Sequence, residues 1–138
     1  MKKIIFLLFV AIAMVACANK VYTLATNDLA GHKFILENFN GVQIRINPSS
    51  SLVGKIEFNE DMEISGSFCN NYIGQASLKD GKLYAVVAST RKFCFDERLT
   101  QAEGAFFKAL SEGANISRSG NVLTITQGGN VFAFRLRD

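Results

Sequence analysis

Two stretches of the chain decide the fold, and each carries one cysteine: Ile64-Ser-Gly-Ser-Phe-Cys-Asn-Asn-Tyr-Ile-Gly74 and Ala88-Ser-Thr-Arg-Lys-Phe-Cys94. The first begins as a strand-like run and ends in small and turn-forming residues. The second lies at the end of the hairpin that follows. We therefore expect the chain to fold around the meeting of these two stretches.

Turn residues separate short apolar runs along most of the chain. Asn40-Gly41 and Asp80-Gly81 are hairpin signals, because these residue types tolerate positive φ. Asn59-Glu-Asp61 separates another pair of runs in the same way. The expected strands span residues 33–38, 42–47, 53–58, 62–67, 72–78, 82–87, 116–118, 122–126 and 131–136.

The spacing of apolar residues changes to a helical period over about residues 98–112. Thr100 and Glu103 fit a capping box at the start of this helix, and Gly113 fits its end. Gly104 lowers the helix propensity, which predicts close packing against a neighbouring element. The apolar stripe consists of Leu99, Ala102, Phe106, Ala109 and Leu110.

These elements predict a mainly β (α+β) fold. A curved antiparallel sheet or open barrel of about 8–9 short strands would pack on the one amphipathic helix, because its apolar stripe must be buried. At 138 residues, the chain is long enough for one domain with a real core.

The first 16 residues are typical of an export signal. Lys2 and Lys3 precede an apolar run of 12 residues, which is shorter than the ~20 residues of a spanning helix. The run ends before Cys17 in a sequence that resembles a bacterial lipobox. We therefore expect a signal peptide over 1–16, acyl chains such as palmitate on Cys17, a tether over 17–28 and the domain over 29–138. The alternative is plain secretion after cleavage near Ala18.

The residues after Cys17 include no aspartate next to it, which resembles the sorting pattern for the outer membrane, facing the periplasm. Acylation of Cys17 leaves Cys69 and Cys94, which an oxidising compartment allows to form a disulfide. The alternative is two buried, reduced cysteines.

The motifs of the chain resemble the META domain family over roughly Leu29 to Arg137. The resemblance rests on apolar residues ending in Phe58, on a Leu-Thr-Ile strand at 123–125, and on an ordered series between them. That series is Gly66, Cys69, Asn70, Gly74, Ser89, Thr90, Cys94 and Glu103. From the residues themselves we expect structural roles: Asn70 and Asn71 in left-handed conformations, Gly66 and Gly74 at close chain approaches, and hydroxyls that bind turn amides.

The inventory of chemical groups favours a protein without catalytic residues, metal or cofactor. The single histidine, His32, has a turn-like context, and a metal site needs several convergent ligands. Glu57, Asp61 and Glu63 supply the carboxylates that a glycosidase needs, but only in composition. Acidic residues on the solvated faces of strands are the usual explanation for such a group. A nucleophilic pair of Cys69 or Cys94 with His32 would be removed by a disulfide.

The family resemblance implies an accessory role in envelope or heat stress and in tolerance of drugs such as novobiocin. The alternative is a protein-binding or inhibitory module that displays the loops near Asn70 and Arg91 on the envelope. From Cys17 onward there are 13 basic and 12 acidic residues, which gives no electrostatic case for nucleic acid. We expect a monomer, held at a membrane through Cys17.

Overall fold

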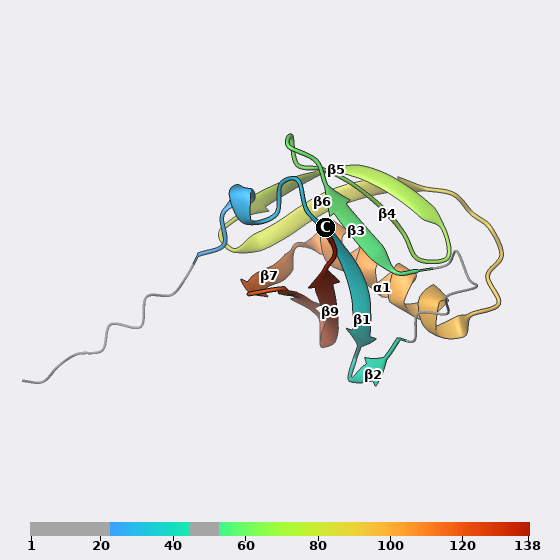
Figure 1. Cartoon of the computed structure of the whole chain (residues 1–138). Helices are drawn as coiled ribbons and strands as arrows, with labels where there is room; N and C mark the ends of the chain where they lie inside the picture. The colour runs from blue at the N-terminus through green and yellow to red at the C-terminus, as the bar shows by residue number, and fades with distance from the viewer. Residues whose placement is uncertain (1–22, 45–52) are drawn as a thin grey trace, which may run out of the picture.

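A computed structural model describes residues 23–44 and 53–138 (Figure 1). The described residues therefore do not include the predicted export signal, Cys17 or residues 45–52. The end of the strand predicted over 42–47 lies in this second gap. The strands are β1 (Lys33–Phe39), β2 (Val42–Gln43), β3 (Lys55–Phe58), β4 (Glu63–Ser67), β5 (Asn71–Lys79), β6 (Lys82–Ser89), β7 (Ala114–Ser119), β8 (Val122–Gln127) and β9 (Asn130–Leu136). A short 3-10 helix, η1 (Thr26–Asp28), precedes them, and the α-helix α1 (Glu97–Glu112) follows β6.

The strands form one antiparallel sheet that closes on itself. From β3 to β9 each strand pairs with the next, β1 pairs with β3, and β9 returns to pair with β1. In that closing pair Phe34 lies opposite Leu136, and Phe39 lies opposite Phe132. The result is an eight-stranded barrel with β2 attached outside, which confirms the expected mainly β fold with one helix and shows that the barrel is closed.

Helix α1 packs where two neighbouring strands of the barrel wall have the fewest paired residues. Strands β6 and β7 pair only at Lys82–Asn115 and Leu83–Ala114, and α1 lies against both strands. The buried residues of the helix are the predicted stripe of Leu99, Ala102, Phe106, Ala109 and Leu110. The ring of Phe106 lies 5.0 Å from that of Phe68 and 5.4 Å from that of Phe132, so one helical side chain joins both sides of the barrel.

The N-cap of the helix lies four residues before Thr100, where the capping box was predicted. Asp96 is the N-cap, and its Oδ1 accepts bonds from the backbone amides of Arg98 at 3.0 Å and Leu99 at 3.2 Å. Thr100 lies inside the first turn, where its hydroxyl donates to the Asp96 carbonyl at 3.0 Å. The capping-box prediction for Thr100 and Glu103 is therefore wrong, because aspartate caps a helix at least as well as threonine.

Two of the glycine predictions have opposite outcomes. Gly113 ends the helix with φ +91°, as expected. Gly104 is exposed, and a Cβ placed there would meet nothing within 4 Å, so the prediction of close packing at Gly104 is wrong. The hairpin turns hold positive φ at Asn40 and Asp80, as the sequence predicts.

Candidate functional site

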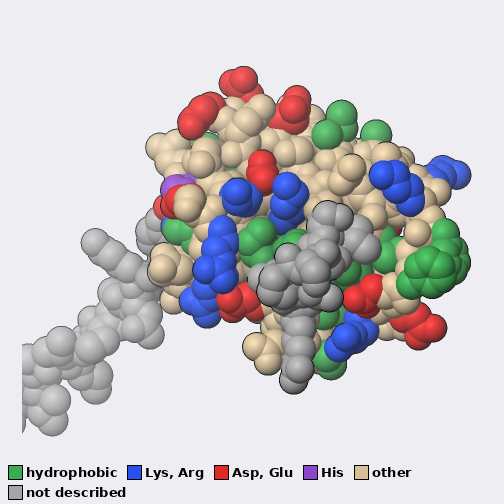
Figure 2. Space-filling view, turned by 45° about the vertical axis from the view of Figure 1, so that its right-hand side comes forward, with side chains coloured by type: hydrophobic (Ala, Val, Ile, Leu, Met, Phe, Trp, Pro, Cys, Tyr) green, Lys and Arg blue, Asp and Glu red, His purple; other side chains and the backbone are tan. Residues whose placement is uncertain are grey.

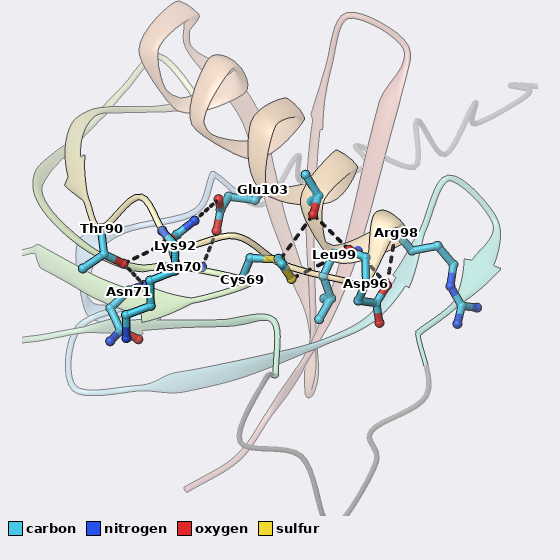
Figure 3. The surroundings of a disulfide bond; sticks show 11 residues. Cys69, Asn70, Asn71, Thr90, Lys92, Asp96, Arg98, Leu99 and Glu103 are labelled. Carbon is cyan, nitrogen blue, oxygen red and sulfur yellow. Dashed lines mark hydrogen bonds between the residues drawn. A yellow bond between two sulfur atoms is a disulfide. The ribbon is translucent and has the colours of Figure 1, made fainter.

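The two motif stretches meet at a disulfide between Cys69 and Cys94 (Figure 3). Their Cα atoms are 5.7 Å apart, and 25 positions of sequence separate them. Cys69 lies between β4 and β5, and Cys94 lies in the loop that leads from β6 to α1. The structure thus contains the bond that the sequence left open, and this bond ties the loop before the helix to the barrel wall.

Glu103 reaches from the helix to the same corner of the barrel. Its carboxylate accepts two hydrogen bonds from Asn70, one from the backbone amide at 2.7 Å and one from Nδ2 at 2.9 Å. Asn70 is 7% exposed, so both donors depend on this carboxylate for their partner. Glu103 therefore fastens α1 to the barrel, a role that its position as a capping residue did not predict.

The side-chain oxygen of Asn70 fastens the loop in turn. It accepts a bond from the backbone amide of Lys92 at 2.6 Å and one from the hydroxyl of Thr90 at 3.0 Å (Figure 3). The Thr90 oxygen also accepts from the backbone amide of Asn71 at 3.1 Å. We call Cys69, Asn70, Thr90, Cys94 and Glu103 the clamp, because they join strand, loop and helix through bonds to one another.

Asn70 and Asn71 do not adopt the left-handed conformation that we expected. Among the described residues, the non-glycine positions with positive φ are Asn40, Met62 and Asp80. The side chain of Asn70 instead bonds groups far along the chain, the backbone amide of Lys92 and the side chains of Thr90 and Glu103.

Gly66 and Gly74 lie where chains approach closely, as predicted. A Cβ on Gly66 would sit 2.0 Å from the backbone oxygen of Lys55 and 2.6 Å from the hydroxyl oxygen of Tyr72. A Cβ on Gly74 would sit 2.7 Å from the backbone oxygen of Val86. No L side chain fits at either position without a shift of backbone.

Tyr72 fills the space that Gly66 leaves, and its hydroxyl donates to the Lys55 carbonyl at 2.8 Å. Burial raises the pKa of the Tyr72 phenol well above its ordinary value, and the charges of Glu57 and Glu103 add to this. Ser89 lies opposite Tyr72 at the end of the β5–β6 pair and is exposed.

The candidate catalytic groups are not gathered at one place: His32 and Glu57 line one open hollow, and Cys69 and Cys94 are bridged elsewhere. Nδ1 of His32 lies 3.3 Å from the Asp138 carboxylate, at an open hollow that Glu57 also lines. Glu57 and Glu63 lie on the neighbouring strands β3 and β4, and Glu57 pairs with Lys55 at 3.3 Å. Within residues 23–44 and 53–138, no three His, Cys, Asp or Glu side chains are placed to hold a metal ion.

None of the helices in the described part of the chain combines the length and the apolar character that crossing a membrane requires.

Sequence reasoning missed two features of this region. One is the cap at Asp96, which could have been found because aspartate is a preferred N-cap residue and an acidic residue, Glu97, follows it in the first turn. The other is the exposure of Phe93 and Phe95, for which the sequence carries no signal.

The closed barrel with its single helix and the clamp define the class of protein. A sequence model of the META domain matches residues 27–138, which is 112 of the 138 residues, so the chain belongs to the META domain family. Over 140 aligned residues the chain is 31% identical to "Heat shock protein HslJ" of Escherichia coli (strain K12), covering 100% of this chain and 98% of the relative.

Two solved structures share the fold. One, described as an NMR structure, has a TM-score of 0.73 and 31% identity and covers 81% of this chain and 94% of its own. The other, an NMR structure of a protein from Burkholderia xenovorans, has a TM-score of 0.62 and 23% identity and covers 82% of this chain and 86% of its own. The second likeness supports the fold alone.

Proposed function

We propose that the protein is a non-enzymatic lipoprotein of the bacterial envelope with an accessory role in heat or envelope stress. Tolerance of drugs of the novobiocin type is part of the same proposal. The similarity to a protein named as a heat shock protein, which runs along the whole chain, supports the stress role.

The observation that supports a protein without enzymatic activity is that the clamp residues are bonded to one another. The two thiols, which the sequence offers as candidate nucleophiles, are joined in a disulfide, and the Glu103 carboxylate of the same clamp is bonded to Asn70. An oxidised cysteine pair has no thiolate to act as a nucleophile. These residues stabilise a shape instead of meeting a substrate.

The anchor at Cys17 is the second part of the proposal, and the apolar run of 12 residues before that cysteine supports it. Two or three acyl chains on one residue hold a domain at a membrane far more firmly than one chain does. We place the domain on the outer membrane, facing the periplasm. Replacing Cys17→Ser should release a soluble form, and a variant that stays with the membrane fraction would refute the anchor.

A deletion strain tests the physiological role. We expect lower survival after a heat challenge and greater sensitivity to novobiocin, both restored by the wild-type gene. Complementation with the Cys17→Ser variant should fail if the membrane position matters. Normal heat survival together with an intact permeability barrier in the deletion strain would count against the proposal.

A second candidate is a protein-binding or inhibitory module, which the exposed loop beside Arg91 favours. A photo-reactive group in place of Arg91 would capture such a partner in the intact envelope. Tyr72 is unsuited to the same experiment because it is only 2% exposed. The absence of any adduct from Arg91 would weaken this second candidate.

A further inference from the structure

The loop between β6 and α1 exposes two phenylalanine rings at its end. Phe93 is 83% exposed and Phe95 is 91% exposed, and their ring centroids lie 5.0 Å apart at an angle of 87°. By contrast, Phe68, Phe106 and Phe132 of the barrel interior are fully buried. Two adjacent large apolar side chains in water mark a contact surface more often than a lone one does. We call Arg91, Lys92, Phe93 and Phe95 the tip.

The backbone of the tip is fixed at two points. Before Phe93, the backbone amide of Lys92 donates to Asn70 Oδ1 at 2.6 Å. Between the two rings, Cys94 is fixed to the barrel by the disulfide. The rings are therefore presented outward by a constrained backbone, and a surface that is already in its bound shape loses less entropy on binding.

Basic side chains lie beside the rings. Arg91 and Lys92 precede them and are exposed, and Arg98 follows on the first turn of α1. The Asp96 carboxylate is turned toward the helix amides, which leaves Glu97 as the other acidic residue nearby. Figure 2 shows hydrophobic side chains that protrude on the right-hand side of the molecule, with Lys and Arg side chains above them and Asp and Glu side chains below them.

The tip lies far from the point where the described chain begins. Thr23 and Gly81 of the β5–β6 turn line the same open hollow, whereas the tip follows the opposite end of β6 (Figure 1). The eight residues of β6 span about 26 Å. Six residue steps, the number from Cys17 to Thr23, can span at most about 20 Å. An anchor at Cys17 and the tip can thus touch one membrane if the β5–β6 hairpin lies along its surface.

We propose that the tip docks on an anionic lipid surface, with Phe93 and Phe95 inserted at the interface and the basic side chains against lipid phosphates. Apolar rings with a basic rim match the two properties of such a surface, its apolar interior and its negative charge. Contact of the tip and the tether with the same membrane rests on the proposed anchor at Cys17. A tethered domain meets its membrane at a high effective concentration, so a weak contact is enough to set its orientation.

Vesicle flotation tests the tip without the anchor. The probe is the oxidised chain from Ala18 onward, which contains every described element, mixed with vesicles of phosphatidylglycerol and phosphatidylcholine in equal parts or of phosphatidylcholine alone. We expect binding to the anionic vesicles that weakens with salt. Phe93→Ser with Phe95→Ser should lower the affinity at least about tenfold, and Arg91→Gln or Lys92→Gln should each lower it about fivefold.

Matched variants on β1 and β9, across the barrel from the β5–β6 hairpin, are the controls. Lys33→Gln on β1 removes the same charge, and Val131→Ser on β9 removes another exposed apolar side chain, so both should bind as the wild type does. Thermal unfolding checks that every variant is folded.

The proposal is overturned if the wild-type chain does not bind anionic vesicles, or if the Phe93→Ser/Phe95→Ser variant binds them as well as the wild type does. It is also overturned if the control variants lose as much affinity as the tip variants. Adducts to a protein from the tip without vesicle binding would also overturn it, in favour of a protein partner. Because the probe lacks Cys17, a failed anchor would not change this result, and the two proposals fail separately.

Discussion

The double variant Cys69→Ser/Cys94→Ser removes the covalent part of the clamp. The sequence separation of 25 positions gives the magnitude, because a cross-link of that length lowers the entropy of the unfolded chain by an amount worth about 3.5 kcal/mol. Serine at position 69 keeps a polar partner, since the sulfur it replaces lies 3.4 Å from the Thr100 hydroxyl oxygen. We therefore expect the free energy of unfolding to fall by about 3–4 kcal/mol, and the Tm by roughly 10–15 °C.

Urea unfolding of the wild type and the double variant, each with and without a reducing agent, measures this loss. The reducing agent should move the wild type toward the variant and leave the variant unchanged, which controls for effects of the substitutions themselves. Mass spectrometry of the unreduced wild type should show the peptides of Cys69 and Cys94 linked. Free thiols at both residues, or a loss of less than about 1 kcal/mol, would refute the reasoning.

Three further substitutions test the fit of single side chains. Gly66→Ala should cost about 3 kcal/mol or more in urea unfolding, because its Cβ would lie 2.0 Å from the Lys55 backbone oxygen; a loss below about 1 kcal/mol would contradict this close approach. Gly104→Ala should instead stabilise by about 1 kcal/mol, since the site is open and alanine favours a helix; destabilisation would show a contact that the structure does not have. The raised pKa of Tyr72 means that its stabilising effect is present below the unfolded pKa of about 10 and is lost as pH rises above it. In urea unfolding, the free energy of unfolding should therefore fall less between neutral and alkaline pH for Tyr72→Phe than for the wild type. An equal fall in both proteins would argue against the buried phenol.

Local patterns in the sequence were enough to predict the strands, the hairpins and the helix. Asn40 and Asp80 take the positive φ that their turn types need, and the stripe that ends at Leu110 is buried as its spacing indicates. Such features depend on residues within a few positions of one another, so one sequence is enough to find them.

Features that join distant parts of the chain were harder to predict. The pairing of Phe34 with Leu136 closes the barrel across nearly the whole domain, and periodicity says nothing about which edges meet. Glu103 fits a helix cap by local spacing, but its carboxylate faces Asn70, which is 33 positions away. A long-range partner decided the role of that side chain, and local rules do not include it.

The same limit applies to the exposed tip. Phe93 and Phe95 would be assigned to the core by residue type alone. Their exposure follows from the disulfide at Cys94 between them, which fixes the backbone so that both rings point outward.

A double-mutant cycle between Asn70 and Glu103 tests most directly whether the clamp is structural. Glu103→Ala should cost about 2–4 kcal/mol in urea unfolding, because two bonds to a charged group are lost and buried donors remain. Asn70→Ala keeps the backbone amide that donates to Glu103, so the cycle measures the side-chain bond alone. The coupling energy should therefore be about 1–2 kcal/mol. Gln101→Ala, an exposed neighbour on the same helix, should change stability by less than about 0.5 kcal/mol. A coupling energy near zero, with Glu103→Ala as stable as the wild type, would contradict the account, since it would leave both residues free for a ligand.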